Sequence, residues 1–198
     1  MSRRILLLLT PAAIALVAVV VIGLRQAPES RTATGGESHP LSAETVQSKL
    51  GGAPPQLAAL HDRANHILPG GRDELRRLLA AVKGHPAVVN VWAAWCGPCI
   101  VELPVFQQVS LDYGKRVAFL GVDLKDNRGR AQRLLRRIPQ TYPSVEDPDG
   151  QIFDGYKLVG TPSTVFYDAR GRQTFVHQGP YQDRQTLEED IRRYALGA

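Results

Sequence analysis

The spacing of apolar side chains divides the chain into three parts. Residues 5–24 form an uncharged, strongly apolar run, whereas residues 26–40 (QAPESRTATGGESHP) are small, polar and rich in Pro and Gly. From residue 56 onward, apolar side chains recur at the spacings of helices and of buried strands. These patterns predict an N-terminal apolar segment, a flexible linker and one globular domain, over residues 1–25, 26–55 and 56–198.

The third part of the chain predicts a mixed α/β fold. Helical spacing of apolar residues predicts helices over 57–67, 75–82, 100–109, 131–138 and 187–194, with a weaker helical pattern over 41–50. Continuous or alternating apolar runs predict strands over 86–92, 117–124, 164–167 and 173–178. Asp73 and Asp183 are placed to cap helices. The order from residue 86 predicts a parallel βαβ unit and an antiparallel ββα unit around one mixed sheet.

The apolar run near the N-terminus has the length of a membrane-spanning helix. At about 1.5 Å per residue, residues 5–24 would cross the roughly 30 Å hydrocarbon layer. Arg3 and Arg4 precede the run, and basic residues hold that end in the cytoplasm. We therefore expect a single-pass anchor in the cell membrane, with the domain on the extracytoplasmic (periplasmic or outer) face. A cleaved signal sequence is the alternative, but the run is long and lacks a small-x-small cleavage site.

The charge distribution adds one candidate surface. The net charge of +5 arises from 24 Lys and Arg against 19 Asp and Glu, spread along the chain, so we expect no nucleic-acid partner. One face of the helix predicted over 131–138 carries a cluster of arginines: Arg128, Arg130, Arg133, Arg136 and Arg137. A solvated helix face is the favoured interpretation, and binding of acidic partners or anionic lipid headgroups is the alternative.

The candidate chemistry lies in two cysteines. Cys96 and Cys99 are the only cysteines of the chain, which excludes a scaffold of several disulfides and a zinc site with four cysteine ligands. They follow the strand predicted over 86–92 and open the next helix. The free N–H groups and dipole of a helix N-terminus stabilise a thiolate, so Cys96 is expected to be the nucleophile and Cys99 the resolving thiol. No histidines stand at ligand spacing, so we expect no metal and no cofactor besides this redox-active pair.

Three separated motifs have a known counterpart. They are residues 89–99 (VNVWAAWCGPC), 102–104 (ELP) and 160–162 (GTP). Together with the order of the strands, they resemble the thioredoxin superfamily, and specifically its membrane-anchored TlpA/ResA-like thiol-disulfide oxidoreductases. The resemblance implies a thioredoxin-like α/β fold, with a central mixed sheet flanked by helices. It also implies a cis peptide bond before Pro162, against the disulfide, with the backbone of Thr161 free to pair with an extended substrate.

The resemblance also implies roles for residues near the cysteines. Glu102 stands where this group carries an acid that tunes the thiols and can pass a proton to Cys99, with an ordinary solvated helix residue as the alternative. The buried Asp and the Lys of cytoplasmic thioredoxins are replaced by Asn90 and Phe119. The expected substrate-binding residues are Trp95, Gly97, Pro98, Thr161 and Pro162.

These observations predict an extracytoplasmic enzyme, a thiol-disulfide oxidoreductase acting as a monomer on protein substrates that contain thiols or disulfides. The resemblance implies reduction of exported proteins, such as apocytochromes c during cytochrome c maturation, with electrons relayed by a membrane protein. The Gly97-Pro98 dipeptide matches reducing thioredoxins and favours reduction over oxidation. The alternative is a membrane-tethered, non-catalytic binding module or metallochaperone. Copper-delivery relatives, however, have a wider cysteine spacing and an added His.

The predicted topology places both thiols outside the cytoplasm. A membrane-impermeant maleimide should therefore label reduced Cys96 in intact spheroplasts. Mass spectrometry of the labelled protein checks this expectation. Labelling that requires lysis of the spheroplasts would contradict the topology.

Overall fold

The structure is a computed structural model that describes residues 41–198. The expected membrane segment over 5–24 and the first part of the expected linker lie outside the described residues. Among the helices within 41–198, none is long and apolar enough to cross a membrane. The fold below is that of the described part.

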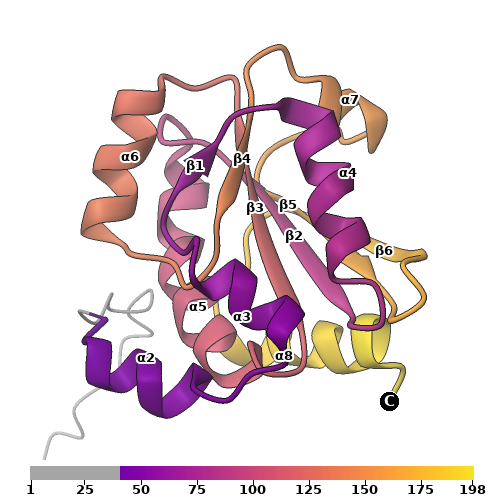
Figure 1. The fold of residues 1–198 in the computed structure, drawn as a ribbon. Coiled ribbons are helices and arrows are strands. Elements are labelled where there is room, and N and C mark those ends of the chain that lie inside the picture. Colours follow the sequence, from indigo (N-terminus) through magenta and orange to yellow (C-terminus); the bar gives the residue numbers. More distant parts are fainter. Residues whose placement is uncertain (1–40) are drawn as a thin grey trace, which may run out of the picture. The chain divides into compact units, whose positions relative to one another are not determined.

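A six-stranded mixed sheet forms the centre of the fold, in the order β1-β4-β3-β2-β5-β6 (Figure 1). Its strands are β1 (Ile67–Leu68), β2 (Ala87–Trp92), β3 (Ala118–Leu124), β4 (Ser144–Asp147), β5 (Ser163–Tyr167) and β6 (Gln173–Gln178). The first four strands pair in parallel, whereas β5 pairs antiparallel with both β2 and β6. The predicted α/β class, with its βαβ unit followed by a hairpin, is confirmed.

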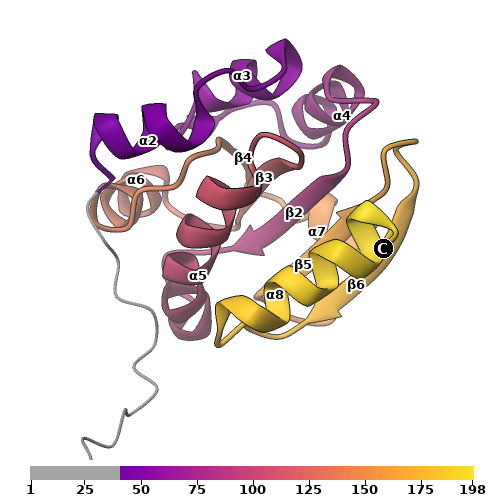
Figure 2. The ribbon, with the colours of Figure 1, turned by 90° about the horizontal axis from the view of Figure 1, so that it is seen from below.

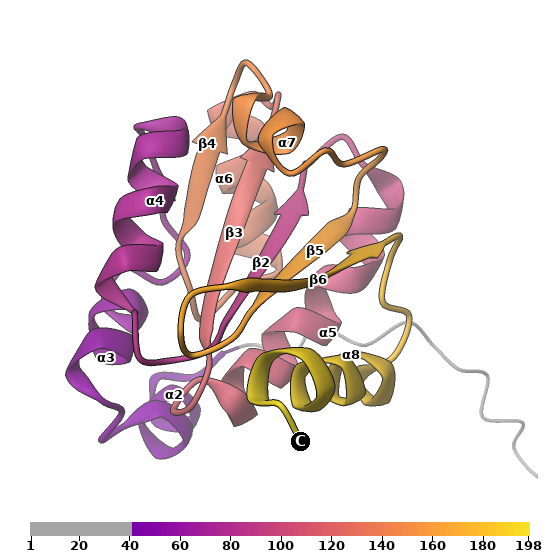
Figure 3. The ribbon, with the colours of Figure 1, turned by 90° about the vertical axis from the view of Figure 1, so that its right-hand side faces the viewer.

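Helices cover both faces of the sheet. They are α2 (Ala43–Leu50), α3 (Pro55–His61), α4 (Gly71–Ala81), α5 (Gly97–Tyr113), α6 (Arg128–Arg137), α7 (Gln151–Gly155) and α8 (Arg184–Asp190), which continues as a π-helical segment (Ile191–Leu196). Helices α5 and α8 lie on one side of the sheet, and α3 and α4 lie on the other (Figures 2 and 3). Asp183 caps α8 as predicted, because its side chain accepts the N–H of Thr186 at 2.8 Å.

Alternation along β2 decides which side chains meet which helices. Every residue of β2 is buried, and successive side chains point to opposite faces of the sheet. Val89 and Val91 join the core under α3 and α4, whereas Val88 joins the core under α5 and α8. Asn90 shares the parity of Val88, so its side chain points toward α5. Trp92 continues this face into a third cluster, which contains both cysteines and the buried face of α6.

The sequence prediction is wrong at the entry to the domain. The helix predicted over 57–67 ends at His61, because Asn65 adopts a left-handed conformation (φ 64°) and Ile67 pairs with Ser144 as part of β1. Asp73 is not a helix cap, since Gly70 occupies that position and Asp73 lies within the first turn of α4.

Two elements were not predicted from the sequence. Strand β4 and helix α7 lie in a region where the pattern indicated turns. Both are short, and β4 contains the polar residues Ser144, Glu146 and Asp147. Pairing of β4 with β3 and β1, rather than apolar periodicity, therefore defines it as a strand.

The described end of the expected linker differs from a flexible tether. Residues 43–50 form α2, whose N-terminus is capped by Ser42 accepting the N–H of Thr45 at 3.1 Å. Leu50 is buried, and Lys49 forms an ion pair with Asp112 of α5 at 2.7 Å. Because Leu50 is the helix's one buried residue, its apolar pattern along the chain is weak.

Gly121 leaves room for a hydrogen bond across the sheet. The indole N–H of Trp92 donates to the hydroxyl of Ser144 at 3.1 Å, from the strands on either side of β3. A Cβ atom on Gly121 would overlap Ser144 Oγ and lie 2.9 Å from Trp92 Nε1. A side chain at this position would therefore displace the buried indole.

We expect Gly121→Ala to lower the free energy of unfolding by about 1–3 kcal/mol, the usual cost of overpacking a core. Urea denaturation of the oxidised protein measures the change. Gly160→Ala is the matched control, because a Cβ there meets no atom within 4 Å. Equal stability of the two variants would show that Gly121 does not serve this close approach.

Candidate active site

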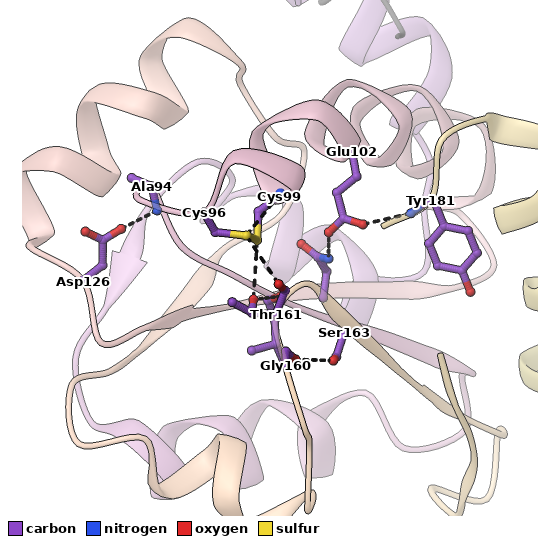
Figure 4. The surroundings of a disulfide bond; sticks show 11 residues. Ala94, Cys96, Cys99, Glu102, Asp126, Gly160, Thr161, Ser163 and Tyr181 are labelled. Carbon is purple, nitrogen blue, oxygen red and sulfur yellow. Dashed lines mark hydrogen bonds between the residues drawn. A yellow bond between two sulfur atoms is a disulfide. The ribbon is translucent and has the colours of Figure 1, made fainter. Parts of the chain in front are cut away.

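The two cysteines form a disulfide at the N-terminus of α5 (Figure 4). Cys96 is the N-cap residue, and its Sγ accepts the backbone N–H of Cys99 at 3.2 Å. The exposed fraction is 4% for Cys96 and 0% for Cys99, so an incoming group reaches Cys96 first. After reduction, the same N–H and the helix dipole would stabilise a thiolate on Cys96. Pro98 lies in the first turn, where its missing N–H costs the helix no hydrogen bond.

Thr161 contacts both sulfurs. The bond between Thr161 and Pro162 is cis, as expected. The carbonyl oxygen of Thr161 lies 3.6 Å from Cys96 Sγ, and its Oγ1 lies 3.4 Å from Cys99 Sγ. The hydroxyl of Thr161 also donates to the carbonyl of Val91 at 3.0 Å. Because that donation commits the hydroxyl proton, Oγ1 presents a lone pair to Cys99 and can accept a hydrogen bond from its thiol.

Glu102 is buried one helical turn beyond Cys99. Its side chain accepts hydrogen bonds from the amide of Asn90 at 2.6 Å and from the backbone N–H of Tyr181 at 3.2 Å. Its exposed fraction is 0%, which contradicts the alternative of a solvated helix residue. Burial raises the pKa of Glu102 to about 8, and the two N–H donors oppose that rise only in part. The carboxyl group therefore holds a proton at neutral pH.

Asn90 and Tyr181 are site residues that sequence reasoning missed. Asn90 was interpreted only as the loss of a buried acid, but in the structure it is the partner of Glu102. Its parity on β2 could have indicated this, because it faces the helix that carries Glu102. Nothing in the sequence indicates Tyr181, which reaches Glu102 through a backbone N–H.

A second set of contacts holds the loop before Cys96. The carboxylate of Asp126 accepts the backbone N–H of Ala94, and the indole N–H of Trp95 donates to the carbonyl of Lys125 at 3.2 Å. In Figure 4, Ala94 and Asp126 lie on the opposite side of the disulfide from Glu102 and Tyr181. The loop between β3 and α6 therefore supports the active-site loop from that side. No sequence motif indicated Asp126.

A second protonated carboxyl group lies beneath this loop. Asp123 is buried near the end of β3, in register with Trp92 and Glu146 on the neighbouring strands. Burial, followed by the negative charge of Asp126, raises the pKa of Asp123 to about 8. Among residues 41–198, no group of three or more His, Cys, Asp or Glu side chains is arranged to hold a metal ion.

The large apolar side chains exposed in the described part come from the segments that build the site. Trp95, Val101 and Val159 are 49%, 52% and 88% exposed. Trp95 precedes Cys96, Val101 lies in the early part of α5, and Val159 lies two residues before Thr161. Gly97 and Pro98 are exposed as well. The predicted substrate-binding residues therefore belong to segments that meet at the disulfide.

Comparison with known proteins decides the family. Residues 66–178 match the model of the AhpC/TSA family, which is more than half of the chain. The chain belongs to this family. With the mixed sheet and flanking helices described above, the match confirms the thioredoxin-like fold and the resemblance inferred from the motifs.

Members with similar sequences carry informative names. The chain is 37% identical over 93 residues to the thiol:disulfide interchange protein DsbE of Pseudomonas fluorescens biotype C, covering 46% of this chain and 51% of that protein. It is 32% identical over 150 residues to the protein of the same name from Xylella fastidiosa (strain 9a5c), covering 74% of this chain and 75% of the relative. The first match thus spans about half the length of the relative.

A solved structure of similar architecture is a secreted disulfide oxidoreductase of Mycobacterium tuberculosis. It superposes with a TM-score of 0.52 at 27% identity, covering 58% of this chain and 85% of that one. The superposition therefore includes most of the smaller protein and leaves part of the present chain without a counterpart.

The raised pKa of Glu102 predicts a pH-dependent stability. From about pH 5 to about pH 8, the folded protein keeps a proton on Glu102 that the unfolded chain, with its ordinary pKa of 4.5, has lost. The free energy of unfolding should therefore fall across this range, by on the order of 4 kcal/mol for this group. Glu102→Gln cannot titrate and should lose that part of the decline.

Urea unfolding at about pH 5 and about pH 8 measures the difference. Near pH 5 both proteins carry a neutral side chain at position 102 and should have similar stability, which serves as the control. Asp123, whose pKa is also raised, contributes a decline of the same sign in both proteins. Identical pH dependence in the two proteins would contradict the protonated state of Glu102.

Proposed function

We propose that this protein is an extracytoplasmic thiol-disulfide oxidoreductase that reduces disulfides of exported proteins through Cys96 and Cys99. The observation that carries the proposal is the disulfide at the N-terminus of α5, packed against Thr161. The names of the similar proteins from Pseudomonas and Xylella support the same chemistry. A binding module without catalysis has no comparable support, since the pair is reachable through Cys96 and stands at a thiolate-stabilising helix end.

The reaction starts from the dithiol. The thiolate of Cys96 attacks one sulfur of a substrate disulfide, so that a mixed disulfide forms and the other substrate sulfur leaves as a thiolate. Cys99, after losing its proton, attacks Cys96 Sγ and releases the second substrate sulfur. Two electrons pass from the cysteine pair to the substrate, and the two protons of the dithiol end on the substrate thiols. A membrane electron-relay protein would return two electrons by the reverse sequence.

Thr161 and Glu102 are placed to serve the proton transfers at Cys99. Thr161 Oγ1 would accept a hydrogen bond from the Cys99 thiol and hold it near Cys96. Glu102 keeps a proton at neutral pH in a buried position one turn away on the same helix. Because an opened disulfide releases Cys99 as a thiolate, a buried acid beside it can return the proton. We therefore assign Glu102 the transfer of a proton to and from Cys99.

The substrate surface would consist of the exposed segments around the disulfide. Trp95, Gly97 and Pro98 would contact the substrate from one side, and Thr161 with Pro162 from the other. An extended substrate segment would pair with the backbone of Thr161 while its sulfur reaches Cys96. The exposed apolar side chains of Val101 and Val159 favour such contacts, because they would be covered by a bound polypeptide.

The cellular setting follows from the N-terminal sequence. We propose that residues 5–24 anchor a monomer in the cell membrane, with the domain on the extracytoplasmic face. The secreted relative from Mycobacterium tuberculosis supports a location outside the cytoplasm. Apocytochromes c are the proposed substrates, as in cytochrome c maturation.

The two cysteines should respond differently to substitution. Cys96→Ser should abolish the reduction of insulin in the presence of dithiothreitol and form no covalent adduct. Cys99→Ser should instead accumulate a mixed disulfide through Cys96, because no third cysteine is present to resolve it. Nonreducing gels and mass spectrometry with an oxidised substrate peptide distinguish the two variants. Adducts on Cys99 alone would reverse the assignment, and inertness of both variants together with an inactive parent protein would favour a binding module.

A further inference from the structure

Helix α6 carries an excess of positive charge that the described structure leaves uncompensated. Its ten residues include five arginines and no acidic residue. Arg128 pairs with Glu146 at 3.3 Å. Within residues 41–198, no ion pair involves the other four arginines, and all of them are exposed: Arg130, Arg133, Arg136 and Arg137.

Three of these arginines line a hollow that reaches the active-site loop. The hollow has a volume of about 260 Å³ and is bordered by Ala94, Arg130, Arg133, Leu134 and Arg137. Ala94 lies two residues before Cys96, and Leu134 is buried, which gives the hollow an apolar floor between cationic walls. The nearby carboxylate of Asp126 does not neutralise these walls, because it accepts the backbone N–H groups of Ala94 and Asn127.

We propose that this hollow docks an acidic segment of the protein substrate, and that it selects disulfides flanked by Asp or Glu on the side facing α6. The inference rests on the proposed function and adds a specificity determinant to it. Guanidinium groups bind carboxylates through paired hydrogen bonds, and complementary charge accelerates encounter. A substrate with basic residues in the same place would be repelled.

The position of the hollow favours a polypeptide over lipid headgroups. A substrate whose sulfur reaches Cys96 must pass within a few residues of Ala94, so its flanking side chains necessarily come near Arg133 and Arg137. Arg136 belongs to the same helix but does not border the hollow. The two kinds of arginine therefore allow local docking to be separated from the general charge of α6.

Two disulfide peptides test the proposal with the reduced full-length protein in a neutral detergent. The peptides are identical except that one carries three Glu residues beside the disulfide and the other three Gln residues. We expect kcat/KM for the Glu peptide to exceed that for the Gln peptide by about tenfold at low salt, and the ratio to fall as salt is added. Equal values for the two peptides at low salt would overturn the docking site.

Charge reversal on α6 provides the matched comparison. Arg133→Glu should bring the Glu-to-Gln ratio to one or below, whereas Arg136→Glu, an equal change of charge on the same helix, should keep most of the preference. Because the measured quantity is a ratio within one protein, a general loss of activity cancels. Arg133→Gln should give an intermediate ratio. An equal loss in the Arg133→Glu and Arg136→Glu variants would overturn local docking in favour of long-range charge.

Two further outcomes are distinct. If neither peptide is reduced although the cysteines are in the dithiol form, the proposed function itself fails. If adding phosphatidylglycerol to the micelles changes the activity of the parent protein but not of the Arg133→Glu variant, while the Glu peptide has no advantage, the arginines bind anionic lipid. That result would overturn the docking of an acidic substrate.

Discussion

The active site depends on the contact between Thr161 and the two cysteine sulfurs. These residues are separated by 65 and 62 positions in the chain, and only the fold brings them together. Antiparallel pairing places Val91 of β2 opposite Ser163 of β5, which positions Thr161 at the end of β2, where α5 begins. The hydrogen bond from Thr161 to Val91 ties that register to the sulfurs. The sheet therefore sets the geometry of the site as much as the cysteine motif does.

Around this contact, the protein keeps carboxyl groups protonated on both sides of the disulfide. Glu102 and Asn90 replace the buried Asp and Lys pair expected in cytoplasmic thioredoxins, so the acid comes from the helix and its amide partner from the strand. Asp123 lies on the other side, under the loop held by Asp126. Burial keeps negative charge away from sulfurs that must themselves become thiolates, while a proton source remains close by.

The parts of the fold that were predictable are those whose residues are apolar for several positions in succession. Strands β2 and β3 and the helix after the cysteines belong to this class, and the motifs around Cys96 and Pro162 located the chemistry. Strands β1 and β4 escaped prediction because they are short and are defined by their neighbours. The burial of Glu102 and the support given by Asp126 depend on residues distant in sequence, so no local pattern indicates them.

The two faces of α6 are subject to different evolutionary constraints. Its inner residues, Ala131, Leu134 and Leu135, pack in the cluster that contains Trp92 and both cysteines, and changes there would disturb the chemistry. Its outer residues contribute no hydrogen bond to the disulfide or to the loop before it. That face can therefore diverge among descendants of this chain while the redox centre stays constant, so one reaction can be directed to new clients by changing a single exposed surface.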